Sequence, residues 1–172
     1  MRIIAGSHRG HRIAAPNGRD TRPTSDRVRE NAFNLIGPVD VADVLDLFAG
    51  SGALGLEALS RGAASATFVE SDREACRTIN ANLDKLKLRG TVLCQEATRA
   101  LARERRRYDL VLCDPPYDYD HGKLAPHLAG LLNEDGLLVY ETSGRADPLD
   151  LPGLEVRTSR KYGSARLTLY ET

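Results

Sequence analysis

The sequence predicts an α/β protein whose core is one doubly wound, mostly parallel sheet of seven strands with an antiparallel hairpin at its C-terminal end. From residue 43 onward, short apolar runs alternate with segments of helical periodicity, which is typical of parallel strands joined by crossover helices. The last two apolar runs, at 154–158 and 166–170, follow each other without a helix and therefore predict an antiparallel hairpin. With 172 residues and 41% hydrophobic content, the chain can bury one such core.

Each element follows from apolar periodicity and from the turn residues beside it. Apolar residues on either side of a glycine-containing loop predict a small β-hairpin over residues 3–14, and Thr24 or Ser25 can cap a helix that ends near Ile36. We therefore divide the chain into an arm, residues 1–36, and a core domain, residues 37–172. Strands are expected at 43–48, 65–70, 91–94, 108–113, 136–142, 154–158 and 166–170, and helices at 53–61, 72–87, 97–105 and 121–132.

Composition and cysteine usage argue against several classes of protein. No apolar stretch approaches the roughly 18 residues of a membrane span, and the first residues lack the apolar core of a signal peptide. Cys76, Cys94 and Cys113 show no C-x-x-C spacing and no paired histidines, so we expect free thiols, a reducing cytoplasmic setting and no metal site. No large apolar stripe is left over after the core is assigned, which favours a monomer.

The net charge of zero hides an uneven distribution of charge. The arm carries seven arginines and three acidic residues, a balance of +4, and the remaining residues carry the compensating negative charge. All the cationic side chains of the arm are arginines, which suit bidentate phosphate contacts and stacking on bases. The arm is either a solvated extension or, as we expect, a nucleic-acid contact.

A glycine-rich loop follows the first strand of the core. Gly50, Gly52 and Gly55 have the G-x-G-x-x-G spacing, and Glu70 ends the next strand about 20 residues later, as a ribose-binding carboxylate should. This pattern also fits a dinucleotide site. Asp46 favours S-adenosylmethionine, because a carboxylate there can reach the ammonium group of a methionine moiety but would repel a pyrophosphate.

The tetrapeptide Asp114-Pro115-Pro116-Tyr117 follows the fourth strand of the core. Two prolines remove two backbone donors and hold the loop extended, so that the Asp114 carboxylate and a neighbouring carbonyl can both accept hydrogen bonds from a planar amine. Tyr117 offers a face on which a base can stack. The loop is either an ordinary turn at the end of a strand or a cage for an exocyclic amine.

Together these residues resemble a known family, the bacterial small-subunit (16S) ribosomal RNA guanine-N2 methyltransferases of the short, single-domain type. The resemblance covers nearly the whole chain. It is carried in the arm by residues 2–6, 9–10 and 22–30, and in the core by residues 46–55, 114–117 and Lys161-Tyr162-Gly163. The sequence departs from the family at Gln95-Glu96-Ala97, where many relatives have an Asp-Ala pair that touches adenine.

The resemblance implies a Rossmann-like class I methyltransferase that transfers a methyl group from S-adenosyl-L-methionine to N2 of one guanine in 16S rRNA, within an assembled or assembling small ribosomal subunit. The catalytic residues it implies are Asp114, Pro115, Pro116 and Tyr117. The implied cofactor-binding residues are Asp46, Phe48, Ala49, Gly50, Ser51, Gly52, Gly55, Glu70, Ser71, Glu96, Ala97 and Asp114. The implied RNA-binding residues are Arg9, Arg12, Arg22, Thr24, Arg27, Arg29 and Lys161.

Three other functions remain open from the sequence. An N6-adenine methyltransferase acting on RNA or DNA could use the same cage, because adenine also presents a planar exocyclic amine. A nicotinamide oxidoreductase would use the glycine loop and Glu70, but it would leave Asp46 and the proline cage without a purpose. A non-catalytic ribosome assembly factor would need only the basic arm.

Overall fold

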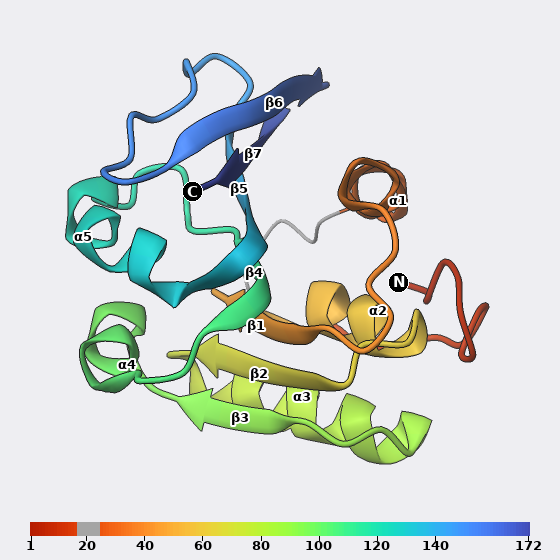
Figure 1. The fold of residues 1–172 in the computed structure, drawn as a ribbon. Coiled ribbons are helices and arrows are strands. Elements are labelled where there is room, and N and C mark those ends of the chain that lie inside the picture. The colour runs from red at the N-terminus through yellow and green to blue at the C-terminus, as the bar shows by residue number, and fades with distance from the viewer. Residues whose placement is uncertain (17–24) are drawn as a thin grey trace.

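The computed structural model describes residues 1–16 and 25–172, which form a seven-stranded sheet covered by helices on both faces (Figure 1). The strands are β1 (Asp43–Leu47), β2 (Ser65–Glu70), β3 (Thr91–Cys94), β4 (Tyr108–Cys113), β5 (Leu132–Ser143), β6 (Glu155–Tyr162) and β7 (Ala165–Glu171). The helices are α1 (Asp26–Ile36), α2 (Ala53–Ser60), α3 (Arg73–Leu86), α4 (Ala97–Arg103) and α5 (Ala125–Leu128), with the 3₁₀ turns η1 (His121–Lys123) and η2 (Ala129–Leu131).

The strand order is β3-β2-β1-β4-β5-β7-β6, which confirms the predicted fold class. Strands β1 to β5 pair in parallel, whereas β7 runs antiparallel to both β5 and β6. The chain reverses its direction of winding between β1 and β4, so the carboxyl ends of these two strands form the switch point where ligands bind in open α/β sheets.

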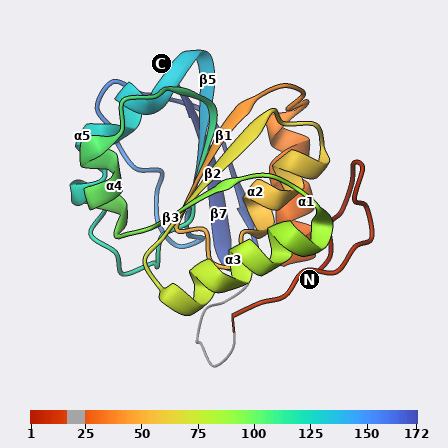
Figure 2. The same cartoon turned by 90° about the horizontal axis from the view of Figure 1, so that it is seen from below.

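The core has two layers, one on each face of the sheet (Figure 2). Residues of α1, α2 and α3 pack on one face and include Phe33, Leu56 and Ile79. Residues of α4 and α5 pack on the other face and include Leu101 and Leu128. Alternate side chains of the central strands are buried in both layers, which explains why these strands are nearly continuous apolar runs in the sequence.

The predicted helix at 121–132 is wrong. The segment divides into η1, α5 and η2, and β5 begins at Leu132, four residues before the predicted start. Pro126 at the beginning of α5 cannot donate a backbone hydrogen bond, and Gly130 disfavours continuation of the helix. The predicted N-terminal hairpin forms as a short antiparallel pairing, with a bridge between Arg2 and Arg12 and backbone hydrogen bonds from Ile3 to His11 at 2.9 Å and from Ile13 to Met1 at 3.0 Å.

Cys76 and Cys94 form a disulfide, which corrects the expectation that all three cysteines are free thiols. Cys94 pairs in register with Glu70 at the end of β2, and Cys76 lies in the first turn of the helix that follows Glu70, so the two Cα atoms lie 6.0 Å apart. A separation of 18 residues in the sequence does not reveal this proximity. Cys113 is free and buried, and burial, with the nearby Asp114, raises the pKa of its thiol.

The arm is tied to the core through the buried carboxylate of Glu57 on α2. Glu57 is fully buried and accepts hydrogen bonds from the backbone N–H groups of Ile4 at 2.8 Å and Ala5 at 3.0 Å. It also pairs with Arg61 at 2.8 Å and lies 3.6 Å from Nε of Arg29. The N-terminal segment therefore has a fixed position on the core.

Arg29, which the sequence predicts to contact RNA, is buried in the structure. Its side chain is fully buried and donates to the carbonyl of Arg2, and it forms an ion pair with Asp26 at 2.8 Å. The α1 face that carries Arg29 packs on the core because Ala32 and Phe33 lie on it, so this arginine serves the packing of the arm. No helix in the described part of the chain is long and apolar enough to cross a membrane.

Candidate functional site

The glycine loop joins the carboxyl end of β1 to the amino end of α2, at the switch point of the sheet. Gly50 and Gly52 have φ angles of 57° and 82°, and Phe48 has the unusual φ of 59°. A left-handed conformation at a bulky residue costs free energy and is found most often at functional loops. A Cβ atom at Gly50 would meet no atom within 4 Å, so the backbone of Gly50 faces open space that a ligand can fill.

The third glycine, Gly55, has a packing role in addition to its predicted place at the cofactor. A Cβ atom on Gly55 would lie 2.4 Å from the ring of Phe68, so only glycine lets α2 pack this closely on β2. The N–H of Gly55 donates to the Asp46 carboxylate at 2.9 Å. Ser51, also expected at the cofactor, is buried, and its carbonyl accepts from Asn82 at 3.0 Å.

Asp46 is buried beneath the glycine loop. Its side chain is 1% exposed, and burial raises its pKa well above the ordinary value, with further contributions from the negative charges of Asp114 and Glu70. The hydrogen bond from Gly55 opposes this effect. Three carboxylates therefore influence one another at this end of the sheet, and a cation bound among them would favour the ionised form of Asp46.

Asp46→Asn should make stability less sensitive to pH. Because the pKa of Asp46 is higher in the folded chain than in the unfolded chain, the wild type loses stability as the pH rises above the ordinary aspartate value of 3.8. Asparagine keeps the acceptor for Gly55 and lacks this titration. Urea unfolding between about pH 5 and pH 8 should show the variant gaining on the wild type as pH rises. A constant difference, or one matched by the exposed control Asp84→Asn, would contradict this account of Asp46.

Glu70 ends β2 and supports the glycine loop directly. One carboxylate oxygen accepts from the N–H of Gly50 at 2.9 Å, and the other accepts from the N–H of Asp72 at 2.8 Å. Ser71 lies between these residues and is exposed. Glu70 therefore fixes the loop at the position where the sequence predicts a ribose-binding carboxylate.

An aromatic pair borders the other side of the loop. The rings of Phe48 and Tyr119 lie 4.9 Å apart in an edge-to-face arrangement, and the Tyr119 hydroxyl donates to Glu96 at 2.8 Å. Glu96 also accepts from Thr98 and from the N–H of Arg99, so it caps α4. Partial burial opposes ionisation, but these hydrogen bonds together lower the pKa of Glu96. Ala97, the other residue expected at the adenine, is buried.

The loop 114–117 lies at the carboxyl end of β4, next to the glycine loop. The N–H of Asp114 donates to the carbonyl of Leu47 at 3.4 Å, and the N–H of Tyr119 donates to the carbonyl of Pro116 at 2.9 Å, which closes a turn. The hydroxyl of Tyr117 donates to the carbonyl of Ser164 at 3.3 Å. The turn between β6 and β7 thus lies beside the loop and brings the exposed Lys161 to the same side of the molecule.

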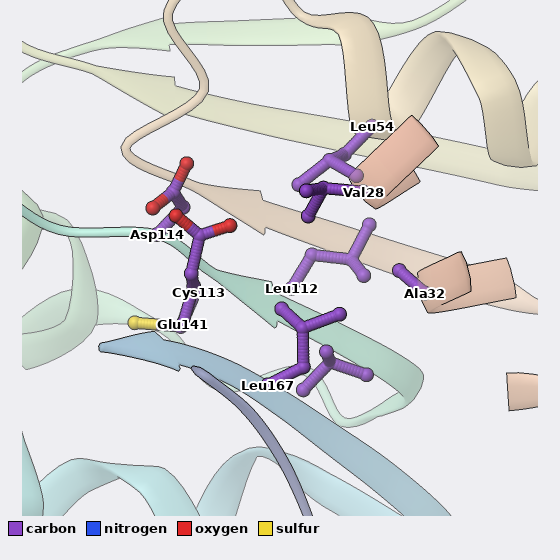
Figure 3. A pocket seen from close by; sticks show the side chains of 9 residues that line it. Val28, Ala32, Leu54, Leu112, Cys113, Asp114, Glu141 and Leu167 are labelled. Atoms are coloured by element: carbon purple, nitrogen blue, oxygen red, sulfur yellow. The ribbon is translucent and has the colours of Figure 1, made fainter. Parts of the chain in front are cut away.

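An apolar pocket opens beside Asp114, between α1, α2 and the sheet (Figure 3). Most of its lining residues come from five elements that are far apart in the sequence, so sequence motifs do not predict the pocket. Glu141 on β5 is the second acidic residue of the lining and was not predicted. The lining residues are Val28, Ala32, Leu54, Leu112, Cys113, Asp114, Val139, Glu141 and Leu167.

The predicted RNA-binding residues divide into three groups. Arg9, Arg12, Arg27 and Lys161 are exposed, Arg29 is buried, and Arg22 and Thr24 lie outside the described residues.

Asn82 on α3 was not predicted as a site residue, and its side chain is 1% exposed. The side-chain amide of Asn82 accepts a hydrogen bond from the N–H of Ala14 and donates to the carbonyls of Ala14 and Ser51, so it links the arm to the glycine loop.

Among residues 1–16 and 25–172, no group of three or more histidine, cysteine, aspartate or glutamate side chains is arranged to hold a metal ion.

The chain is similar over most or all of its length to bacterial proteins. YlbH of Bacillus subtilis (strain 168) is 39% identical over 181 residues, covering 99% of this chain and 98% of that protein. Ribosomal RNA small subunit methyltransferase D of Escherichia coli (strain K12) is 43% identical over 143 residues, covering 82% of this chain and 71% of that protein. A solved structure of Escherichia coli yhhF matches with a TM-score of 0.89 at 36% identity, covering 99% of this chain and 96% of that chain.

The model of one protein family matches residues 1–171, which includes both the arm and the core. The matched range contains the glycine loop and the loop 114–117, whose geometry is described above. The chain therefore belongs to the family described as Conserved hypothetical protein 95.

Proposed function

We propose that the protein is an S-adenosyl-L-methionine-dependent methyltransferase that acts on the exocyclic N2 of one guanine in small-subunit (16S) rRNA, within an assembled or assembling subunit. The observation that carries this proposal is the position of Asp114-Pro115-Pro116-Tyr117 beside the glycine loop, at the switch point of the sheet. The relatives named as small-subunit rRNA methyltransferases support the choice of substrate.

The residues around the glycine loop fit the proposed cofactor. Open space above Gly50 admits a ligand, and Asp46, Glu70 and Asp114 place negative charge around it. S-adenosylmethionine carries positive charge on its sulfonium and ammonium groups, whereas the pyrophosphate of a nicotinamide cofactor would be repelled by the same carboxylates. When bound, the cofactor supplies an activated methyl group with a good leaving group.

The residues of the loop 114–117 then deal with the poor nucleophilicity of the amine. The lone pair of an exocyclic amine is delocalised into the ring, and hydrogen bonds from its two protons to Asp114 and to the carbonyl of Pro115 favour a tetrahedral nitrogen. Tyr117, held by its bond to Ser164, supports the face of a base flipped from its stack. These residues contribute mainly by positioning the nitrogen in line with the methyl group.

Glu70→Ala should weaken cofactor binding by about 1.5–3 kcal/mol, which is typical for the loss of a charged hydrogen bond. Glu70 would lose its contact with the ribose, and Gly50 would lose the acceptor that fixes the loop. Isothermal titration with S-adenosylmethionine measures this effect, with the exposed Glu74→Ala as the control. An affinity equal to that of the wild type would remove Glu70 from the cofactor site.

Labelled S-adenosylmethionine tests the proposed reaction on three substrates: small subunits, naked small-subunit rRNA and DNA. Nucleoside mass spectrometry should find the label in N2-methylguanosine from the small-subunit samples. Label in N6-methyladenine would be consistent with an amine-binding role of the loop 114–117, but it would show that the target base is adenine and not guanine. If the protein binds the cofactor but no sample contains label, the proposed methyltransferase activity would be overturned.

A further inference from the structure

Strand β5 brings a second carboxylate to the pocket beside Asp114. Tyr140 on β5 pairs in register with Cys113 on β4, and Glu141 and Asp114 each come one residue later. Asp114 lies one residue beyond the end of β4, and both acids line the pocket at the carboxyl edge of the sheet. Figure 3 shows both carboxylates at the same end of the pocket.

Glu141 is a nearly buried acidic residue in a mostly apolar pocket. Its side chain is only 8% exposed, and apart from Asp114 and Cys113 the rest of the pocket is lined by aliphatic side chains from α1, α2, β4, β5 and β7. The pocket has a volume of about 10 Å³, enough for about one water, so a base would bring only its polar edge to the two acids while its ring stays at the mouth of the pocket. A carboxylate in this position accepts hydrogen bonds and donates none when ionised.

We propose that Glu141 selects guanine by accepting a hydrogen bond from N1–H of the target base, while Asp114 holds the adjacent N2 amine. This inference rests on the proposed function. Guanine carries two neighbouring donors on this edge, N1–H and the N2 amine, and the two carboxylates are two neighbouring acceptors. Adenine also has an exocyclic amine for Asp114, but its N1 is an acceptor and would face the Glu141 carboxylate without a proton between them. The amine cage fits both bases, and Glu141 distinguishes them.

The test uses 2-aminopurine, which keeps the N2 amine of guanine and lacks the proton on N1 together with the O6 carbonyl, so the change of base preference in a Glu141 variant separates the effect of N1 from that of O6. Small subunits are reconstituted with guanine or 2-aminopurine at the nucleotide that the wild type methylates, and kcat/KM is measured for each. The wild type should prefer guanine by about 100-fold or more, because a site built for an N–H donor rejects an analogue without it. Glu141→Gln should lower kcat/KM on guanine about 10- to 100-fold.

The same variant should lose most of the preference for guanine over 2-aminopurine, because a glutamine amide can donate to an unprotonated N1. A residue that merely supported the fold would not change this ratio. The control is Glu134→Gln, which alters an exposed residue at the opposite end of β5 and should keep the wild-type ratio. Thermal melting and S-adenosylmethionine affinity verify that each variant folds.

A folded Glu141→Gln variant with the wild-type base ratio would overturn the inference. Equal methylation of guanine and 2-aminopurine by the wild type would also overturn it, and this result does not depend on any variant. A wild type that methylates the N2 of no guanine would instead refute the proposed function itself, so the two failures are distinguishable.

Discussion

Asp114→Asn should reduce methyl transfer about 10²- to 10⁴-fold while cofactor affinity stays within about twofold of the wild type. Asparagine has nearly the same shape, but it loses the negative charge that draws the protons of the target amine and favours a tetrahedral nitrogen. Single-turnover rates with small subunits and labelled S-adenosylmethionine measure the effect, and titration calorimetry measures cofactor binding.

The matched control for Asp114 is Asp118→Asn, which removes an exposed carboxylate four residues later in the same segment. This control should retain the wild-type rate. Near-normal turnover by Asp114→Asn would remove Asp114 from the mechanism. A loss of cofactor binding as large as the loss of rate would place its main role at the cofactor.

Glu57→Gln should lower the free energy of unfolding by about 3–5 kcal/mol, the usual effect of breaking a buried ion pair by removing one partner. The buried Arg29 would lose the carboxylate that lies 3.6 Å away and keep only the partly exposed Asp26 as an opposite charge, and Ile4 and Ala5 would share a weaker acceptor. Urea denaturation measures the change, with Glu30→Gln as an exposed control on α1.

A loss below about 1 kcal/mol would show that Glu57 behaves like a surface ion pair, in conflict with its complete burial. The rate of protease cleavage within residues 1–16 is a second, independent test of the same prediction. If Glu57 ties the arm to the core, cleavage should be faster in the variant than in the wild type under native conditions.

Most of the fold was predictable because its signals are local. The parallel strands are apolar runs, the capping residues Ser25 and Asp72 are suited to their positions, and the apolar stripe of α3 has helical spacing. The helix predicted at 121–132 failed because the apolar residues there satisfy helical spacing while Pro126 and Gly130 interrupt the backbone. The Cys76–Cys94 disulfide depends on strand register, which the sequence does not determine.

The candidate site also has parts that could be predicted from local sequence and parts that could not. The glycine loop and the loop 114–117 are contiguous in the sequence and could be recognised from residue type and spacing. Glu141 reaches the site from a strand with no motif around it, since strand order brings it there. Tyr119 lies just beyond the loop 114–117, and loop closure brings its ring against Phe48. The burial of Arg29 could not be predicted either, because an arginine in a basic segment suggests an exposed nucleic-acid contact whereas its helix face is packed against the core.

A comparison of small-subunit rRNA from wild-type cells and from cells that lack this gene tests the central claim most directly. Nuclease mapping followed by mass spectrometry should find one guanine that carries an N2-methyl group in the wild type and none in the deletion strain, and a plasmid copy of the gene should restore it. The Asp114→Asn copy should fail to restore it. Identical methylation in both strains, or the loss of a methyl group from adenine instead, would contradict the account.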